Sequence, residues 1–357
     1  MEQKYIDRLN KDIYALCRNA LKLAFTNPGR FAFLLKTLFY QIKAAKLRKS
    51  FVNDNITVPA FMIFSVTSKC NLNCKGCYAQ SQHREASPDI SIDKLRSILN
   101  ESKELGISIA LISGGEPLAR KDLLGILSEF PRTLFALFTN GLLVDDSAMK
   151  TFSENKNIIP IVSIEGSKNF TDTRRGEGTY QNITGLYRKL ENKKIFFGTS
   201  ITITSENYKP VFEGGFIEEA VRFGCGLFFF IEYIPVLDGT DNLLLSEEQK
   251  EEIKKYVVSF QQKYPALFLS FPSGEDIYGG CLAAGRGFIH ISADGKLEPC
   301  PFSPYSDSDL NKMSLKEALK SDLLKKIREN HGKMKESRGG CALWENRAWV
   351  EEISAKK

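Results

Sequence analysis

Residues 60–78 read AFMIFSVTSKCNLNCKGCY, so an apolar run is followed closely by three cysteines. The run at 60–66 has the length and composition of a buried strand. In α/β proteins, functional residues gather on the loop that follows a strand. The pattern therefore predicts a strand and then a metal-binding loop that contains Cys70, Cys74 and Cys77.

The spacing of these three cysteines suits a small cluster better than a single metal ion. A mononuclear zinc site needs a fourth ligand close by, and His83 is poorly spaced to supply it. In a cubane with four irons, three irons take cysteine and the fourth stays open for another ligand. A zinc site and three structural cysteines remain the alternatives at this point.

Five further apolar, β-rich runs alternate with amphipathic segments. Six strands separated by helices indicate a parallel α/β sheet with both faces covered. The sheet is either open and doubly wound or a full or partial (β/α) barrel, and the pattern alone leaves this choice open. The five runs are ISIALIS (107–113), TLFALFT (133–139), IIPIVSI (158–164), IFFGTSITI (195–203) and GLFFFIEYI (226–234).

Three segments between these strands are predicted helices. The first begins at Ser91, a candidate N-cap, and ends at Gly106, the expected C-terminal stop. The other two are DDSAMKTFSEN (145–155) and TYQNITGLYRKLEN (179–192).

Composition places the chain among ordinary folded proteins. Its 357 residues are 43% hydrophobic and 26% charged, which fits one large domain with an appendage, or two domains. No N-terminal segment has the pattern of a secretory signal, and no run reaches the roughly 18–20 apolar residues of a membrane-spanning helix. The eight cysteines cluster like ligands, so we expect a cytoplasmic, reduced protein.

Three later motifs accompany the cysteine loop in a fixed order. SGGEP (113–117) follows the second strand, SIEG (163–166) ends the fourth, and DTRRGEGTY (172–180) comes next. Together with the CxxxCxxC loop, they make residues 60–235 resemble the radical S-adenosylmethionine superfamily. The resemblance implies that the three cysteines bind a 4Fe-4S cluster whose open iron is chelated by the amino and carboxylate groups of S-adenosylmethionine.

The resemblance also implies a set of cofactor-binding residues. Two glycines let the backbone approach the ligand, one glutamate accepts the methionine ammonium, and one arginine pairs with the methionine carboxylate. A serine and a second glutamate lie where the ribose and carboxylate are held. These residues are Gly114, Gly115, Glu116, Ser163, Glu165 and Arg175. One departure is Gly76, because the family often has an aromatic residue there, near the adenine; Tyr78 is close by.

The implied fold is a partial (β/α)6 TIM-type barrel, which we place at residues 58–240. The implied chemistry is reductive cleavage of S-adenosylmethionine to a 5′-deoxyadenosyl radical, which abstracts hydrogen from a substrate C–H bond. A reductant such as flavodoxin or ferredoxin would supply the electron. No catalytic residue is assigned beyond the cluster and S-adenosylmethionine.

Three further cysteines, Cys281, Cys300 and Cys341, lie in the predicted C-terminal domain, residues 241–357. IHISADGKLEP (289–299) is a hairpin pattern whose Asp294-Gly295 pair suits a type I′ turn, and a helical stretch is predicted at 314–330. The arrangement resembles the twitch form of the SPASM extension, which implies a linker helix and one auxiliary 4Fe-4S cluster. Core cysteines and a zinc knuckle are the alternatives.

The N-terminal arm, residues 1–57, carries the basic charge. Residues 1–50 hold eleven Lys and Arg against three Asp and Glu, a net +8, whereas the whole chain carries +6. We expect two helices broken at 26–29, with an apolar stripe on the second. The arm either packs on the barrel, adsorbs to the anionic inner face of the membrane, or binds an acidic partner, which we do not expect to be a nucleic acid. The stripe is Phe31, Leu34, Leu35, Leu38 and Ile42, and the nearby cations are Lys36, Lys43, Lys46, Arg48 and Lys49.

The resemblance therefore implies a radical enzyme acting on a membrane lipid or a small metabolite. A peptide-modifying maturase is one alternative, and a non-catalytic iron-sulfur electron-transfer protein is another.

Overall fold

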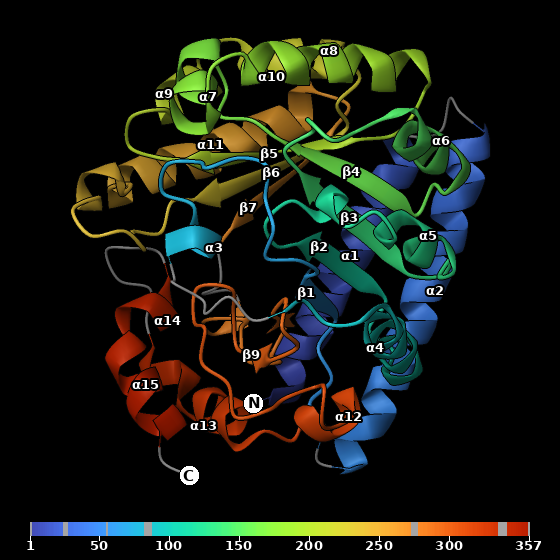
Figure 1. Cartoon of the computed structure of the whole chain (residues 1–357), viewed down its shortest axis with the longest axis vertical. Helices are drawn as coiled ribbons and strands as arrows, with labels where there is room; N and C mark the ends of the chain where they lie inside the picture. The colour runs from blue at the N-terminus through green and yellow to red at the C-terminus, as the bar shows by residue number, and fades with distance from the viewer. Residues whose placement is uncertain are drawn as a thin grey trace.

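The computed structural model describes residues 2–23, 28–54, 56–81, 88–272, 278–334 and 341–355. Within these residues, nine strands form one curled sheet, a half-barrel (Figure 1). The strand order is β7-β6-β5-β4-β3-β2-β1-β8-β9, and every pair is parallel except β8 with β9. The strands are β1 (Phe61–Ser65), β2 (Ile109–Ser113), β3 (Leu134–Thr139), β4 (Ile158–Ser163), β5 (Gly198–Ile203), β6 (Leu227–Glu232), β7 (Leu267–Phe271), β8 (Phe288–Ile291) and β9 (Leu297–Glu298). The predicted partial barrel and its six strands are confirmed.

Alternation along each strand separates two apolar faces. In β1, Met62 and Phe64 are fully buried in the core between the sheet and the helices, whereas Phe61 and Ile63 face the inside of the curl. In β6, Phe228 belongs to the outer core and Phe229 to the inner cluster. Both faces are apolar because helices cover the outside and the curl encloses the inside, which explains the near-continuous apolar runs.

Helices fill the connections and surround the sheet. Figure 1 shows the helices of the barrel outside its curl and the C-terminal helices, in red, on the side away from α8 and α10. The helices are α1 (Glu2–Leu23), α2 (Pro28–Ser50), α3 (Tyr78–Ser81), α4 (Ile92–Leu105), α5 (Leu123–Ser128), α6 (Asp146–Glu154), α7 (Lys168–Arg175), α8 (Thr179–Asn192), α9 (Tyr208–Phe212), α10 (Phe216–Arg222), α11 (Glu247–Lys263), α12 (Leu315–Ala318), α13 (Asp322–Asn330), α14 (Ala342–Glu345) and α15 (Arg347–Ala355). Short 3₁₀ turns are η1 (Phe51–Asp54), η2 (Pro117–Ala119), η3 (Asp241–Leu243) and η5 (His331–Lys333).

The predicted caps of α4 are confirmed. The Ser91 side chain accepts a hydrogen bond from the Lys94 amide at 3.1 Å, and Gly106 ends the helix in the left-handed region with φ 84°. Helices α6 and α8 also lie where the sequence predicts them. The helical stretch predicted at 314–330 is present as two helices, α12 and α13, because the Ser321 side chain caps a new helix by accepting from the Leu324 amide at 3.0 Å.

The C-terminal hairpin adds two strands to the barrel sheet. Strand β8 pairs in parallel with β1, and the Phe61 and Phe288 rings stack with centroids 5.4 Å apart. The predicted hairpin is confirmed, but its type I′ turn is wrong: Gly295 alone of the central pair has a positive φ, 88°, and its amide donates to the Ser292 carbonyl at 3.0 Å. Strand β7 was not predicted. The one sheet contains strands from both sides of residue 240. The division of the chain into domains at residues 57 and 240 therefore stays a prediction.

Helix α1 packs on the barrel through apolar side chains such as Tyr5 and Leu9, whereas α2 packs through a largely polar face. In α2 the buried positions include Gln41, Ala45 and Arg48, which are 2%, 4% and 6% exposed. The Arg48 Nη1 donates to the Gly106 carbonyl and its Nη2 to the Asn10 side chain, both at 2.6 Å. Burial lowers the pKa of Arg48 to about 10. This side chain therefore ties α1 and α2 to the end of α4. The helix break was predicted at residues 26–29; residues 24–27 lie outside the described residues, and α2 begins at Pro28.

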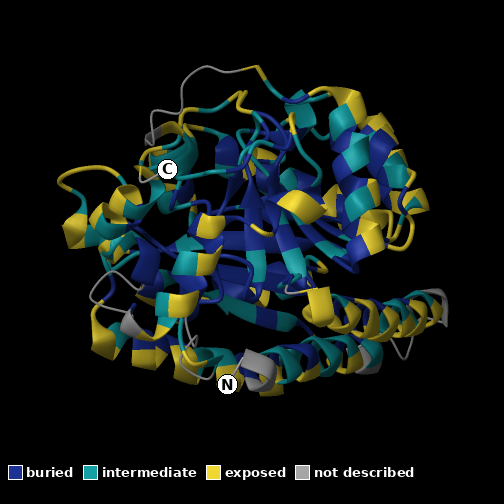
Figure 2. Cartoon of the chain, turned by 90° about the horizontal axis from the view of Figure 1, so that it is seen from below, coloured by how far each residue is buried: buried dark blue, intermediate teal, exposed yellow. Residues whose placement is uncertain are grey.

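The predicted apolar stripe of α2 is divided between two faces. Phe31, Leu34 and Leu38 are half-buried, whereas Leu35 and Ile42 are 51% and 38% exposed. Figure 2 shows such exposed residues on the outer helices and buried ones in the central strands. Within the described residues, no helix has both the length and the apolar character needed to cross a membrane.

Arg48 and Lys49 form a matched pair for testing this packing. Arg48→Met removes two buried hydrogen bonds, so we expect the free energy of unfolding to fall by about 1–3 kcal/mol. Lys49→Met removes an exposed ion pair with Asp7, 2.7 Å between Nζ and Oδ1, and should cost at most about 1 kcal/mol. Urea unfolding measures both, and equal losses would show that the Arg48 contacts do not hold the arm.

Candidate functional site

Both sets of cysteines line one cavity of about 310 Å³. The cavity lies at the carboxyl ends of the parallel strands, where residues such as Ser113, Thr139 and Ser163 end β2, β3 and β4. Loops at this edge carry the functional groups of barrel proteins. The predicted site residues that line the cavity are Cys70, Cys74, Cys77, Gly114, Gly115, Glu116, Ser163, Arg175, Cys281, Cys300 and Cys341; Glu165 lies behind it.

The two glycines of SGGEP bring the β2 loop against the start of the cysteine loop. The Gly115 amide donates to the Thr67 carbonyl and the Glu116 amide to the Lys69 carbonyl, both at 2.8 Å. A Cβ at Gly114, whose φ is 128°, would overlap with the Thr67 carbonyl oxygen. The close approach that requires glycine here is between two backbone segments. Contact of these glycines with a cofactor stays a prediction.

Four other contacts hold the cysteine loop. The Asn140 side chain donates to the Asn71 side chain at 2.7 Å, and the Lys75 amide donates to the Arg174 carbonyl at 2.9 Å. The Arg174 Nε donates back to the Lys75 carbonyl at 3.1 Å. Gly76 has φ 66°, and a Cβ there would lie 2.9 Å from the Tyr233 hydroxyl, so the Tyr233 ring fills the space beside it. The loop is thus fixed to the ends of β3 and β6 and to α7.

Glu116 is almost fully buried and faces the cavity. Its carboxylate accepts from the Leu118 amide at 3.1 Å, the Thr139 hydroxyl at 2.8 Å and the Asn140 amide at 2.7 Å. Burial raises the pKa of Glu116 above its ordinary value, although these three donors oppose the change. A carboxylate offers about four acceptor positions, so one remains for a cationic ligand group.

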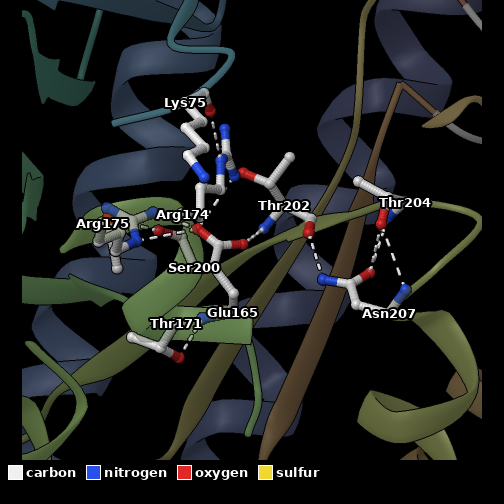
Figure 3. Close-up of polar contacts among 10 residues, drawn as sticks. Lys75, Glu165, Thr171, Arg174, Arg175, Ser200, Thr202, Thr204 and Asn207 are labelled. Atoms are coloured by element: carbon white, nitrogen blue, oxygen red, sulfur yellow. Dashed lines mark hydrogen bonds and ion pairs between the residues drawn. The ribbon is translucent and has the colours of Figure 1, made fainter. Parts of the chain in front are cut away.

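Glu165 is the centre of a buried ion-pair network, shown in Figure 3. Its Oε1 accepts from Arg174 Nη1 at 2.9 Å and from Arg175 Nε and Nη2 at 2.9 and 2.6 Å. Its Oε2 accepts from the Thr202 amide at 3.1 Å. Burial acts to lower the pKa of Arg175, but the Glu165 carboxylate and Cys74 act to raise it and together outweigh burial. The pKa of Arg175 therefore lies above its ordinary value. The sequence assigned Glu165 and Arg175 to a cofactor, and in the structure they bind each other.

Arg174 is the residue of this network that sequence reasoning missed. It links Glu165 to the Lys75 carbonyl and so connects the network to the cysteine loop. The only signal was its place beside Arg175 in DTRRGEGTY. Ser163 meets Ser200 at 2.9 Å between hydroxyl oxygens, on the cavity wall. Tyr78 packs on Phe302, with centroids 5.2 Å apart, and so lies toward the C-terminal segment.

The two cysteine sets differ in exposure. Cys70 is exposed and Cys74 and Cys77 are half-buried, whereas Cys281, Cys300 and Cys341 are buried. Burial raises the pKa values of the Cys70 and Cys74 thiols, and Arg175 opposes this at Cys74. No three His, Cys, Asp or Glu side chains of the described residues are grouped so as to hold a single metal ion. A cubane has no such requirement, because its cysteines bind different irons.

A buried network joins the C-terminal hairpin to the barrel. His290 is fully buried, with Nδ1 at 2.7 Å from Glu298 Oε2 and Nε2 at 2.8 Å from the Ser65 hydroxyl. Ser303 follows Cys300 in a tight turn and is 2% exposed, and its hydroxyl has no hydrogen-bond partner in the described structure. An unsatisfied buried hydroxyl beside a buried thiol fits a site completed by a bound group.

Comparison with known proteins relates this site to a family. The family model described as Radical SAM superfamily matches residues 64–212. A GTP 3',8-cyclase of Alkaliphilus metalliredigens is 27% identical over 268 residues, which cover 67% of this chain and 80% of the relative. A probable GTP 3',8-cyclase of Methanococcus vannielii is 37% identical over 266 residues, 66% of this chain and 82% of the relative.

The fold is similar to that of a solved structure. SuiB of Streptococcus suis, crystallised with S-adenosylmethionine, aligns with a TM-score of 0.66 and 18% identity over 90% of this chain and 80% of SuiB. At this level of identity the likeness establishes the shared fold.

Glu165→Gln tests the ion-pair network. The amide leaves two half-buried guanidinium groups without their buried carboxylate, so we expect the free energy of unfolding to fall by about 3–5 kcal/mol. Alkylation of Cys74 should also become faster, because Arg174 loses its anchor. The control is Glu129→Gln, whose carboxylate pairs with Arg96 at the surface, 2.8 Å from Oε2 to Nε, and whose loss should hardly move the urea midpoint. Equal shifts in the two variants would contradict the assignment.

Proposed function

This chain belongs to the radical S-adenosylmethionine superfamily and is an enzyme, and on that premise we propose that it cleaves S-adenosylmethionine reductively and uses the 5′-deoxyadenosyl radical to abstract hydrogen from a substrate C–H bond. The observation that carries this proposal is that one cavity at the strand ends is lined by the three thiols of the cysteine loop together with Glu116, Ser163 and Arg175. An electron-transfer protein has no use for such a cavity. GTP, named for the relatives, is one of several substrates that this function admits.

The family implies a 4Fe-4S cluster and S-adenosylmethionine, and the residues present fit both. Cys70, Cys74 and Cys77 would hold the cluster, which supplies the electron for cleavage. Glu116 would accept the methionine ammonium through its remaining acceptor position. Arg175 would meet the methionine carboxylate while keeping its bonds to Glu165, and Ser163 would contact the ribose from the end of β4.

A second cluster in the C-terminal segment is part of the proposal. Cys281, Cys300 and Cys341 come from distant parts of the chain and line the same cavity. Ser303 would direct its unsatisfied hydroxyl to the bound cluster. With three thiolates available, one iron would take a non-cysteine ligand, solvent or the substrate. We keep 1–57, 58–240 and 241–357 as the proposed arm, barrel and auxiliary domain.

We place the enzyme in the cytoplasm, supplied with electrons by a flavodoxin or ferredoxin, and adsorbed to the inner face of the membrane through α2. Leu35, Phe39 and Ile42 are 51%, 64% and 38% exposed at positions that share one helix face. Exposed Lys36, Lys43 and Lys46 lie on the same helix. Apolar insertion and attraction to anionic lipids act together at such a surface. Two of the cations predicted from the sequence are not part of this surface. Arg48 is buried, and Lys49 pairs with Asp7.

Cysteine variants test the two clusters separately. Anaerobically reconstituted protein should carry about eight irons per chain, the content of two cubanes. Changing Cys70, Cys74 and Cys77 to Ala should leave about four and abolish formation of 5′-deoxyadenosine. Cys300→Ala should lower the iron content but preserve cofactor cleavage. Buried Cys225, which lies outside this cavity's lining, is the control: Cys225→Ala should keep full iron content. Cofactor cleavage by the triple variant would refute the assignment.

Sedimentation with anionic vesicles tests the membrane surface. Replacing Lys36, Lys43 and Lys46 with Gln should weaken binding about a hundredfold, since each lysine near the surface contributes about 1 kcal/mol. Added salt should weaken binding of the unaltered protein as well. A control variant changes exposed Lys189, Lys193 and Lys194 to Gln and removes the same charge elsewhere. Unaltered protein that stays in the supernatant at low salt would refute the proposal.

A further inference from the structure

Polar and apolar side chains occupy different parts of the cavity. The polar part comes from the ends of β2 to β5 and from α7, and includes Glu116, Ser163, Thr202 and Arg175. The apolar part comes mainly from β1, β6, β7, β8 and the segment after Cys300. Its members are Phe61, Ile63, Leu111, Phe138, Phe229, Ile231, Phe271, Phe288, Pro301 and Phe302.

The aromatic rings at the cavity form three packed groups, which we call the aromatic walls. Phe229 packs against Phe138 and Phe271, with centroids 5.1 and 6.0 Å apart. Phe61 stacks on Phe288 across the junction of β1 and β8, and Tyr78 packs on Phe302 between the two cysteine-bearing segments. The Tyr78–Phe302 pair therefore places part of the apolar surface between the two segments that carry the cysteines, and both sets of cysteines line the same cavity.

The charges of the described residues that line the cavity disfavour an anion. Among the described residues that line it, the basic ones are Arg174 and Arg175, and both donate to Glu165. Glu116 and Glu232 also line the cavity, and the proposed function pairs the Glu116 carboxylate with the methionine ammonium. Taking a phosphate or several carboxylates out of water without new cationic partners costs several kcal/mol per charge. In the proposed function, Arg175 binds the methionine carboxylate of the cofactor, so it does not bind an anionic group of the substrate.

Resting on the proposed function, we infer that the substrate presents an uncharged, carbon-rich body to the radical, held by the aromatic walls, and that polyanions such as GTP are excluded. The polar part of the cavity takes S-adenosylmethionine, and the apolar part takes the substrate. Hydrophobic burial supplies the affinity, so the reacting C–H bond belongs to an aliphatic or aromatic skeleton rather than to a nucleotide sugar or base.

The test uses holoprotein loaded with clusters and S-adenosylmethionine. The neutral naphthalene dye Prodan is titrated by fluorescence, and GTP is measured by equilibrium dialysis. We expect saturable Prodan binding and no retention of GTP. Phe302→Ser and Phe271→Ser, two independent variants of half-buried rings, should each weaken Prodan binding about tenfold. Val258→Ser, at a position 54% exposed on α11, should leave it unchanged.

Stoichiometric GTP binding, or Prodan binding unchanged in both phenylalanine variants, would overturn the inference. The same samples are assayed for 5′-deoxyadenosine under strong reductant without substrate. A protein that cleaves the cofactor but retains GTP disproves the substrate class alone. A protein that never forms 5′-deoxyadenosine disproves the proposed function, whatever the dye shows.

Discussion

Burial of the Glu165 carboxylate is the constraint on which the rest of the site depends. A carboxylate that is 1% exposed must be paired, and two segments of the chain pair it: the end of α7 through Arg174 and Arg175, and β5 through the Thr202 amide. Arg174 also donates to the Lys75 carbonyl and so joins the cysteine loop to this pair. The network fixes the cysteine loop relative to the strand ends. The barrel supplies a rigid edge, and this ion pair decides how the loop with the thiols lies on it.

The six barrel strands and most of their helices were predictable because their signals are local. Apolar runs of strand length, a serine cap and a terminal glycine depend on neighbouring residues, and α4 has the predicted bounds. Strand β7, LFLSF, was missed although it is apolar, because it follows a helix in a segment assigned to another domain. The parallel pairing of β8 with β1 joins residues more than two hundred positions apart, and no local pattern encodes it.

The candidate site was predictable as a set of residues but not as a set of contacts. The motifs identified eleven of the cavity-lining residues. They did not show that Glu165 and Arg175 bind each other, that Arg174 holds the cysteine loop, or that Tyr233 lies against Gly76. Glu165 and Arg175 are ten positions apart, so each could pair with the other or with a ligand, and only the tertiary structure decides. The apolar stripe of α2 could not be placed for the same reason. Its helical period was predicted correctly, but the barrel packs on the polar face of α2.

The central claim is that the cysteine loop, Glu116 and Arg175 form one cofactor site. Electron paramagnetic resonance of the anaerobically reduced protein, recorded with and without S-adenosylmethionine, tests it most directly. If the methionine end binds the open iron beside Glu116, the signal of the reduced cluster changes on addition of S-adenosylmethionine, and the change is lost in Glu116→Ala. A spectrum that is the same with and without saturating S-adenosylmethionine would contradict the account.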